Sequence, residues 1–217
     1  MGIPVMIIGP PASGKSTALR KFGPSEIGIF NAEKKPLPFQ KNLPIINTSN
    51  YSTIEQVLSQ GQFKTYAIDD CQALIVNDWL SRSSERGFDK FVFIAKNFKD
   101  LIDFIKEKTP PDVIVYLLHH SELGTDGKQK AQTIGKMLDE KIQIVGLFTI
   151  VFYSDVDKDG HFFITAPDEV YPARSPVVWD ENGETCKPLF EARIPNDLKM
   201  VDDTIREYYG IPREEAK

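Results

Sequence analysis

Short apolar runs alternate along the chain with stretches whose apolar residues recur at helical spacing. The runs are rich in β-branched and aromatic residues and have the length of strands. They predict strands over residues 3–8, 27–30, 44–46, 63–68, 113–118, 147–153 and 162–164. Because strands alternate with helices, the pattern predicts an α/β fold with a mainly parallel central sheet and helices on both faces.

The helical stretches have recognisable ends. Gly23 and Pro24 end a helix that is expected to start near Gly14. Residues 52–55 have the form of a capping box, and the helix that follows is expected to end at Gly61. Apolar faces predict the remaining helices: one with Leu74 and Leu80, one with Phe98, Leu101, Ile102 and Ile105, one over 134–142, and one with Leu198, Val201, Ile205 and Tyr208 behind an Asn196 cap.

Polar and proline-rich stretches separate these elements. Residues 34–44 and 121–132 are expected to form loops, the second a mobile one, and residues 155–160 a turn between two strands. The pattern contains no internal repeat and no low-complexity tract. We therefore expect a single domain over residues 1–217, with 194–217 as a C-terminal helical tail.

The first predicted strand leads directly into GPPASGKST, which has the pattern GxxxxGK[ST] of a phosphate-binding loop, or P-loop. The loop glycines let backbone N–H groups turn inward toward phosphate oxygens, and Lys15 supplies a charge for the β- and γ-phosphates. The Ser16 hydroxyl can ligate Mg²⁺. The expected nucleotide-binding residues are Gly9, Pro10, Pro11, Ala12, Ser13, Gly14, Lys15, Ser16 and Thr17. The sequence therefore predicts binding of ATP or another nucleoside triphosphate together with Mg²⁺.

Composition and charge narrow the class of protein. A hydrophobic content of 41% and a charged content of 26% are typical of a soluble globular protein. Cys71 and Cys186 fit no metal or disulfide spacing, which favours a reducing, cytoplasmic compartment. No stretch has the length of a membrane span, so no membrane partner is expected. The net charge of −5 excludes an overall attraction to nucleic acid, so any DNA contact has to be local.

Three acidic residues follow the predicted strands that come after the P-loop. Asp69 ends an apolar strand, where a carboxylate can hold the water shell of Mg²⁺, or alternatively serve as an acidic strand end. Asp70 is either a helix cap or a second catalytic acid. Glu33 follows the second strand at the carboxyl edge of the sheet, where a base could polarise water, or it is an exposed loop acid.

Two adjacent histidines, His119 and His120, end another predicted strand at the same edge. A histidine there can sense the γ-phosphate by hydrogen bonding and pass that information to the following loop. Because successive strand residues face opposite ways, at most one of the two is expected to reach the nucleotide. His161, in the turn after Asp157 and Asp159, is interpreted as part of a solvated hairpin.

Two segments carry the residue types that bind single-stranded nucleic acid. The loop from residue 121 contains Lys128 and Lys130, and residues 82–91 interleave arginine and lysine with phenylalanine. Lysine neutralises phosphates and aromatic rings stack on bases. A solvated loop and a buried aromatic helix would have the same composition, and the sequence leaves the two interpretations open.

Several segments now form a recognisable order. After the P-loop come FNAEKKPLP, YAIDD, YLLHH, TIGKML, YPARSP and IPNDL. In this order and spacing the chain resembles the RecA-core P-loop ATPases, most closely the compact phage nucleotide-binding proteins that include the Sak-type single-strand annealing recombinases. The resemblance covers nearly the whole chain. It implies a RecA-like fold and ATP hydrolysis linked to single-stranded DNA in recombination or replication, in the host cytoplasm if the protein is phage-encoded.

The resemblance also implies residue roles. Glu33 would be the general base, Asp69 the Mg²⁺-linked carboxylate and His120 the γ-phosphate sensor. Arg174 would reach a neighbouring subunit's nucleotide, which implies a homo-oligomer, either a ring or a filament. Lys136 would begin the helix after a DNA-binding loop that contains Lys128 and Lys130. A phage single-strand-binding protein is a further implied partner.

Two other classes of protein fit parts of the sequence. A small P-loop kinase would have the same size and P-loop, although the arginines here are fewer and more scattered than a kinase lid usually requires. A scaffold that binds ATP and recruits a partner without appreciable turnover would also retain the P-loop, and the pair Glu33 and Asp69 argues against it.

Overall fold

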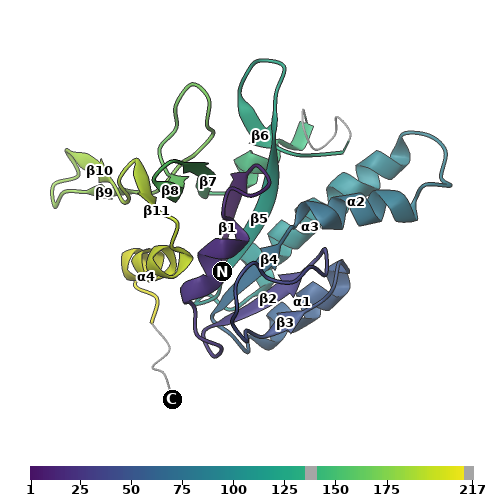
Figure 1. Cartoon of the computed structure of the whole chain (residues 1–217), viewed down its shortest axis with the longest axis horizontal. Helices are drawn as coiled ribbons and strands as arrows, with labels where there is room; N and C mark the ends of the chain where they lie inside the picture. The colour runs from purple at the N-terminus through teal and green to yellow at the C-terminus, as the bar shows by residue number, and fades with distance from the viewer. Residues whose placement is uncertain (135–140, 213–217) are drawn as a thin grey trace.

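A computed structural model of the chain describes residues 1–134 and 141–212. Its centre is a mostly parallel mixed sheet with the strand order β11-β8-β7-β1-β5-β4-β2-β3 (Figure 1). The parallel strands are β1 (Ile3–Gly9), β2 (Ile27–Asn31), β3 (Ile45–Ile46), β4 (Thr65–Asp69), β5 (Ile114–Leu123) and β7 (Ile150–Asp157). The strands β8 (Gly160–Ile164) and β11 (Arg193–Pro195) extend this sheet in antiparallel pairs. The predicted α/β class and the mostly parallel sheet are confirmed.

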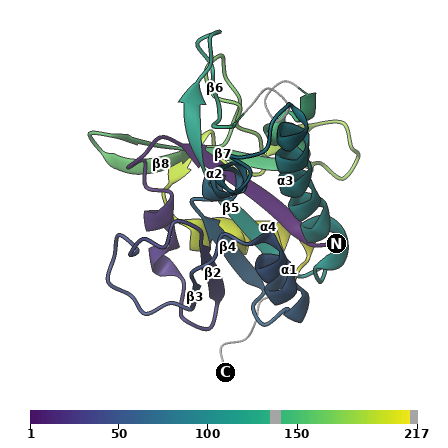
Figure 2. The ribbon, with the colours of Figure 1, turned by 90° about the vertical axis from the view of Figure 1, so that its right-hand side faces the viewer.

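Helices cover both faces of the sheet because its strands are apolar on both sides. The helices α1 (Tyr51–Gln60), α2 (Gln72–Ser81) and α3 (Asp89–Lys108) pack on one face. On the other face lie α4 (Leu198–Tyr209) and a short 3₁₀ helix, η1 (Ser16–Lys21), seen as the purple turn opposite α3 in Figure 2. In β1, Met6 and Ile8 belong to the first layer and Val5 and Ile7 to the second, as the two-residue period of a strand requires.

Several helix ends differ from the expected ones. The helix after the P-loop is only the six-residue η1, because Phe22 takes an extended conformation and is buried ahead of Gly23 and Pro24. The capping residue of α1 is Asn50 rather than Ser52, and it accepts a hydrogen bond from the Thr53 amide. The predicted helix over 134–142 falls mostly on 135–140, outside the described residues.

The expected loop over 121–132 is instead a β-hairpin. Strand β5 continues to Leu123 and pairs in antiparallel fashion with β6 (Gln129–Ala131). Gly127 has a φ of 78° in the connecting turn, and the Gly124 amide donates to the Lys128 carbonyl at 2.7 Å. The sequence pattern missed this hairpin because its strands are polar on both faces. In Figure 1 the hairpin rises above the sheet from the end of β5.

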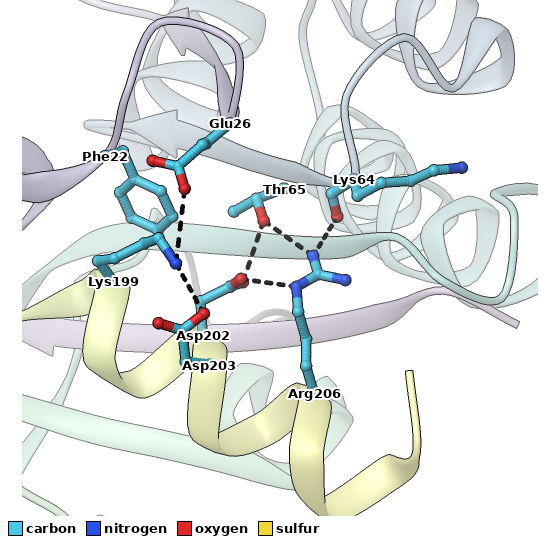
Figure 3. Close-up of a pocket in the computed structure, with 8 residues that line it drawn as sticks. All are labelled: Phe22, Glu26, Lys64, Thr65, Lys199, Asp202, Asp203 and Arg206. Atoms are coloured by element: carbon cyan, nitrogen blue, oxygen red, sulfur yellow. Dashed lines mark hydrogen bonds and ion pairs between the residues drawn. The ribbon is translucent and has the colours of Figure 1, made fainter. Parts of the chain in front are cut away.

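Helix α4 is integrated into the core by a buried ion pair. Arg206 and Asp202 are both about 3% exposed, and Nε of Arg206 donates to Asp202 Oδ2 at 2.7 Å. Nη2 of Arg206 donates to Oγ1 of Thr65 on β4 at 2.8 Å, and Tyr116 on β5 donates to Asp202 at 3.1 Å. Figure 3 shows the contacts of Arg206 with Asp202 and Thr65, between α4 and the start of β4. Contrary to the predicted apolar stripe, Tyr208 is exposed.

Three further β-strands were not expected from the sequence, and one of them is β11, which takes up the first residues of the expected C-terminal helical tail. The strands β9 (Val177–Trp179) and β10 (Cys186–Pro188) form a separate two-stranded sheet. A second 3₁₀ helix, η3 (Ile144–Leu147), precedes β7, which therefore starts at Ile150 rather than at Leu147. No described helix combines the length and apolar content needed to cross a membrane.

Candidate functional site

The P-loop lies between the carboxyl ends of β1, β5 and β7. Gly9, the last residue of β1, pairs in register with His120 on β5. A side chain at Gly9 would collide with the Ser154 carbonyl oxygen on β7, and Gly14 has a φ of +97°, so both positions favour glycine. The Ser154 hydroxyl donates to the Ser13 carbonyl at 2.8 Å. These contacts hold the loop against the edge of the sheet.

Lys15 is folded back onto its own loop. Its Nζ donates to the carbonyls of Gly9 and Pro10, both at 2.9 Å, and lies 3.3 Å from Nδ1 of His120. The side chain is buried, and burial lowers the pKa of Lys15 to about 8 even though Asp69 and Asp70 act in the opposite direction. A cation at this place is positioned to neutralise phosphate oxygens.

Ser16 and Asp69 meet at the start of η1. The Ser16 hydroxyl donates to Asp69 Oδ1 at 2.7 Å, across 53 positions of sequence. Burial raises the pKa of Asp69, and the Ser16 hydrogen bond partly offsets that effect. The described residues contain no cluster of three metal-ligating side chains. Ser16 and Asp69 nevertheless fit Mg²⁺, because this ion is usually held by one or two oxygen groups with waters and substrate phosphates completing its shell.

Asp70 faces the cavity and does not cap the following helix. The N-cap of α2 is Cys71, without a side-chain hydrogen bond, so the capping interpretation of Asp70 is wrong. Asp70 has a φ of 53°, and its carboxylate contacts His120 Nε2 at 3.3 Å and Lys35 Nζ at 3.2 Å. The hydrogen bond from His120, followed by the charge of Lys35, holds the pKa of Asp70 well below its usual range.

Glu33 lies beside this cluster and is linked to it through Lys35. Its Oε2 is 3.8 Å from Lys35 Nζ, and 37% of its side chain is exposed. Glu33 does not line the cavity of about 470 Å³ that the P-loop encloses. The residues lining that cavity are Pro11, Ala12, Gly14, Lys15, Ser16, Thr17, Lys35, Pro36, Pro38, Asp69, Asp70, His120 and His161.

The two strand-end histidines have different surroundings. His120 lines the cavity, whereas His119 is fully buried on the other side of β5. His119 Nε2 donates to the Gln132 carbonyl at 2.7 Å, so its Nδ1, 3.0 Å from Cys71 Sγ, accepts from the thiol. Burial lowers the pKa of His119 to about 4. Of the two histidines only His120 therefore lines the cavity, and the expectation that at most one of them reaches a nucleotide stays a prediction.

Two residues near the P-loop were missed by the sequence interpretation. His161, at the start of β8, is exposed in the β7–β8 hairpin as predicted, but its ring also packs directly on Gly14 and lines the cavity, which the sequence did not indicate. Asn196 does not cap α4, since Asp197 does so. Instead its side-chain amide donates to the Gly14 carbonyl at 3.2 Å. Both contacts join residues more than 140 positions apart, and no local pattern reveals them.

The remaining predicted site residues do not join this cavity. Arg174 pairs through its backbone with Val151, and its guanidinium donates to the Val145 carbonyl at 3.1 Å. Lys128 is exposed in the turn of the β5–β6 hairpin, and Lys130 forms an ion pair with Glu122. Lys136 lies outside the described residues.

A scan against models of protein families finds none that matches the chain, and a search of curated proteins finds no match either. Function therefore has to be argued from the site's own residues and geometry.

Proposed function

We propose that the chain binds ATP with Mg²⁺ at the P-loop and hydrolyses it, as a RecA-like ATPase would. The observation that carries this proposal is the contact between Ser16 and Asp69 at 2.7 Å, beside the buried Lys15. The loop hydroxyl and the strand carboxylate come from distant parts of the sequence, and both are ligand types that suit Mg²⁺. A loop that matched the P-loop pattern by chance would not require a carboxylate from a distant strand next to its serine.

The strand order supports a role for His120 at the γ-phosphate. Strand β5 lies between β1, which carries the P-loop, and β4, which carries Asp69. This order places His120 between Lys15 and Asp70, with contacts of 3.3 Å to each. Lys15 binds the β- and γ-phosphate oxygens, and His120 donates to the γ-phosphate. A bound Mg²⁺ would supply charge neutralisation between the β- and γ-phosphates.

Glu33 remains our proposed base for the attacking water. Asp70 is the alternative, but its oxygens already accept from His120 and Lys35, and its lowered pKa makes it a weak proton acceptor. Glu33 contacts only Lys35 among the charged groups of this cluster, at 3.8 Å. Lys35 links the two carboxylates, with its Nζ 3.8 Å from Glu33 and 3.2 Å from Asp70.

We further propose that single-stranded DNA contacts the β5–β6 hairpin and that Arg174 acts on a neighbouring subunit. The hairpin begins directly after His120, and the Gln132 amide donates to the His120 carbonyl at 2.8 Å. A change at the γ-phosphate can therefore reach the root of the hairpin. Arg174 is exposed and outside its own cavity, which suits action in trans.

Titration calorimetry and turnover measurements test the ATPase proposal. Lys15→Ala should abolish ATP binding, while Lys108→Ala, which changes an exposed lysine outside the cavity, should leave it unchanged. Glu33→Gln should retain ATP binding and lower turnover ~10²-fold or more. Unchanged affinity in Lys15→Ala would refute nucleotide binding at this loop. A loss below about threefold in Glu33→Gln, with a larger loss in Asp70→Asn, would transfer the base role to Asp70.

A further inference from the structure

A second cavity of about 470 Å³ lies on the face of the sheet that α1, α2 and α3 cover. The start of α1, the end of α2 and the middle of α3 bound it, and we refer to it as the three-helix cavity. Every residue that lines it has a polar side-chain group, and none of them lines the P-loop cavity. The lining residues that matter here are Tyr51, Glu55, Asp78, Ser81, Asn97 and Asp100. A hollow of this kind has room for a small ligand.

Acceptor oxygens without a donor gather in the three-helix cavity. The Glu55 carboxylate forms no hydrogen bond or ion pair with another described residue. Asn97 donates its amide group to Asp78 Oδ2 at 2.7 Å, which leaves the Asn97 carbonyl oxygen to accept from a ligand. The Ser81 hydroxyl donates to the Asp78 carbonyl at 2.7 Å and keeps its lone pairs. A ligand with several N–H donors matches these groups.

The charges of the three-helix cavity leave one anion uncompensated. Its lining includes the carboxylates of Glu55, Asp78 and Asp100 and no cation. Asp78 is paired with Arg82 at 2.9 Å, and Asp100 with Lys96. Burial, followed by the charge of Asp100, raises the pKa of Glu55, as expected for a carboxylate in negative surroundings. One positive charge beside Glu55 would complete the balance.

A buried hydroxyl belongs to the same cavity. Tyr51 lines it from the first turn of α1, and its hydroxyl oxygen is buried without a hydrogen bond to any described residue. Burial, followed by the charge of Asp78, raises the pKa of Tyr51, so the hydroxyl keeps its proton. A buried polar group without a partner lowers the stability of the fold. A hydrogen bond to a ligand would remove this cost.

We propose that the three-helix cavity binds a small organic cation whose charged group is a guanidinium. The charge lies between Glu55 and Asp100, and the N–H groups donate to these carboxylates and to the Asn97 carbonyl. A guanidinium fits several acceptors from three helices because it has five donors in one plane and no acceptor, whereas an ammonium has three donors around a point. The described residues place no three metal-ligating side chains together, so a bare metal ion is a poorer match.

Amide NMR titration of the full chain with n-butylguanidine tests this proposal. At physiological salt, which screens non-specific attraction, the compound should shift the amide signals of residues 49–55, 77–81 and 97–100 with a dissociation constant of about 1 mM or tighter. Butylurea has nearly the same shape without the charge and should bind at least about tenfold more weakly. Butylamine has the charge with fewer donors and should also bind more weakly than butylguanidine.

Matched variants assign the binding to this cavity. Glu55→Gln keeps the size of the side chain and should weaken butylguanidine binding at least about tenfold, because a charge-assisted hydrogen bond is lost. Tyr51→Phe should weaken it about three- to tenfold. Glu181→Gln makes the same change at an exposed acid in the turn between β9 and β10 and should bind as the wild type does. The amide spectrum of each variant shows whether it is folded.

This site is independent of the proposed ATPase activity. Lys15→Ala should bind butylguanidine with the affinity of the wild type, because Lys15 does not line the three-helix cavity. A failure of nucleotide binding at the P-loop therefore leaves this proposal standing, and the reverse also holds.

Four results would overturn the proposal. The first is the absence of shifts around the three-helix cavity at 10 mM butylguanidine, a concentration about tenfold above the expected dissociation constant. The second is equal binding of butylurea, which would indicate a neutral polar ligand. The third is wild-type affinity in folded Glu55→Gln. The fourth is the same set of shifts with Ca²⁺ or Mg²⁺ alone and none with butylguanidine, which would assign the cavity to a metal ion.

Discussion

If the P-loop binds a nucleotide as proposed, the pKa of Lys15 should make nucleotide affinity depend on pH in a defined direction. Burial lowers this pKa from 10.5 to about 8, whereas a bound triphosphate surrounds the same ammonium with negative charge and restores its proton. Because the folded chain holds this proton less tightly than the unfolded chain, the nucleotide-free fold gains stability as pH rises from 8 toward 10.5. Nucleotide affinity falls over the same interval.

The size of the effect follows from the titration of one group. With a pKa of about 8 in the free protein and one above 10 in the complex, binding takes up about 0.1, 0.5 and 0.9 proton at pH 7, 8 and 9. The dissociation constant therefore rises about tenfold between pH 7 and pH 9, which corresponds to about 1.4 kcal/mol.

Titration calorimetry in buffers of different ionisation enthalpy measures the proton uptake directly. The slope of the observed enthalpy against the buffer enthalpy gives the number of protons at each pH. His120→Asn is the matched control, because it removes the imidazole that lies 3.3 Å from Lys15 and retains Lys15 and the P-loop. We expect the same rise in uptake toward pH 9 in this variant.

Two outcomes would refute the reasoning. Uptake that vanishes at pH 9 and is absent in His120→Asn would assign the proton to the histidine. Zero uptake at every pH, with tight nucleotide binding, would mean that Lys15 keeps its proton in the free protein.

Three further predictions test other parts of the structure. Ser16→Ala should bind nucleotide as tightly as the wild type when a chelator removes Mg²⁺. When Mg²⁺ is present, the increase in nucleotide affinity that Mg²⁺ causes should be at least about tenfold smaller than in the wild type. His161→Ala should weaken nucleotide affinity about three- to tenfold at unchanged thermal stability, and equal affinity would remove His161 from the site. Arg206→Met should destabilise the fold by about 3–5 kcal/mol in urea unfolding, because Asp202 stays buried without its partner, and a loss below about 1 kcal/mol would contradict this.

The sequence predicted the strands that position the site because these are marked locally. An apolar run that ends on a polar residue identifies a strand and its carboxyl edge together, as at Asp69 and His120. Parallel pairing then brings such ends to one edge of the sheet. The P-loop and the positions of Lys15, Ser16 and Asp69 around it followed from this reasoning.

What the sequence could not predict depends on contacts between distant segments. Asn196 resembles a helix cap because asparagine before an apolar stripe usually is one, but its neighbour Asp197 takes that role. His161 lies in a polar turn, and only the pairing of β8 with β7 brings it over Gly14. The β5–β6 hairpin and the two-stranded sheet of β9 and β10 contain too few alternating residues for a period of two to stand out.

A short series of hydrogen bonds connects the cavity to the β5–β6 hairpin. His120 contacts Lys15 and Asp70 with its side chain, and its carbonyl accepts from the Gln132 amide at 2.8 Å. His119, on the opposite face, donates to the Gln132 carbonyl at 2.7 Å. The backbone of Gln132 is thus hydrogen-bonded to both histidines. Burial lowers the pKa of His119 to about 4, so that ring is neutral at physiological pH and protonation does not disturb its hydrogen bond to Gln132. If the site binds a nucleotide as proposed, a shift of β5 at the γ-phosphate would therefore move the root of the hairpin with it.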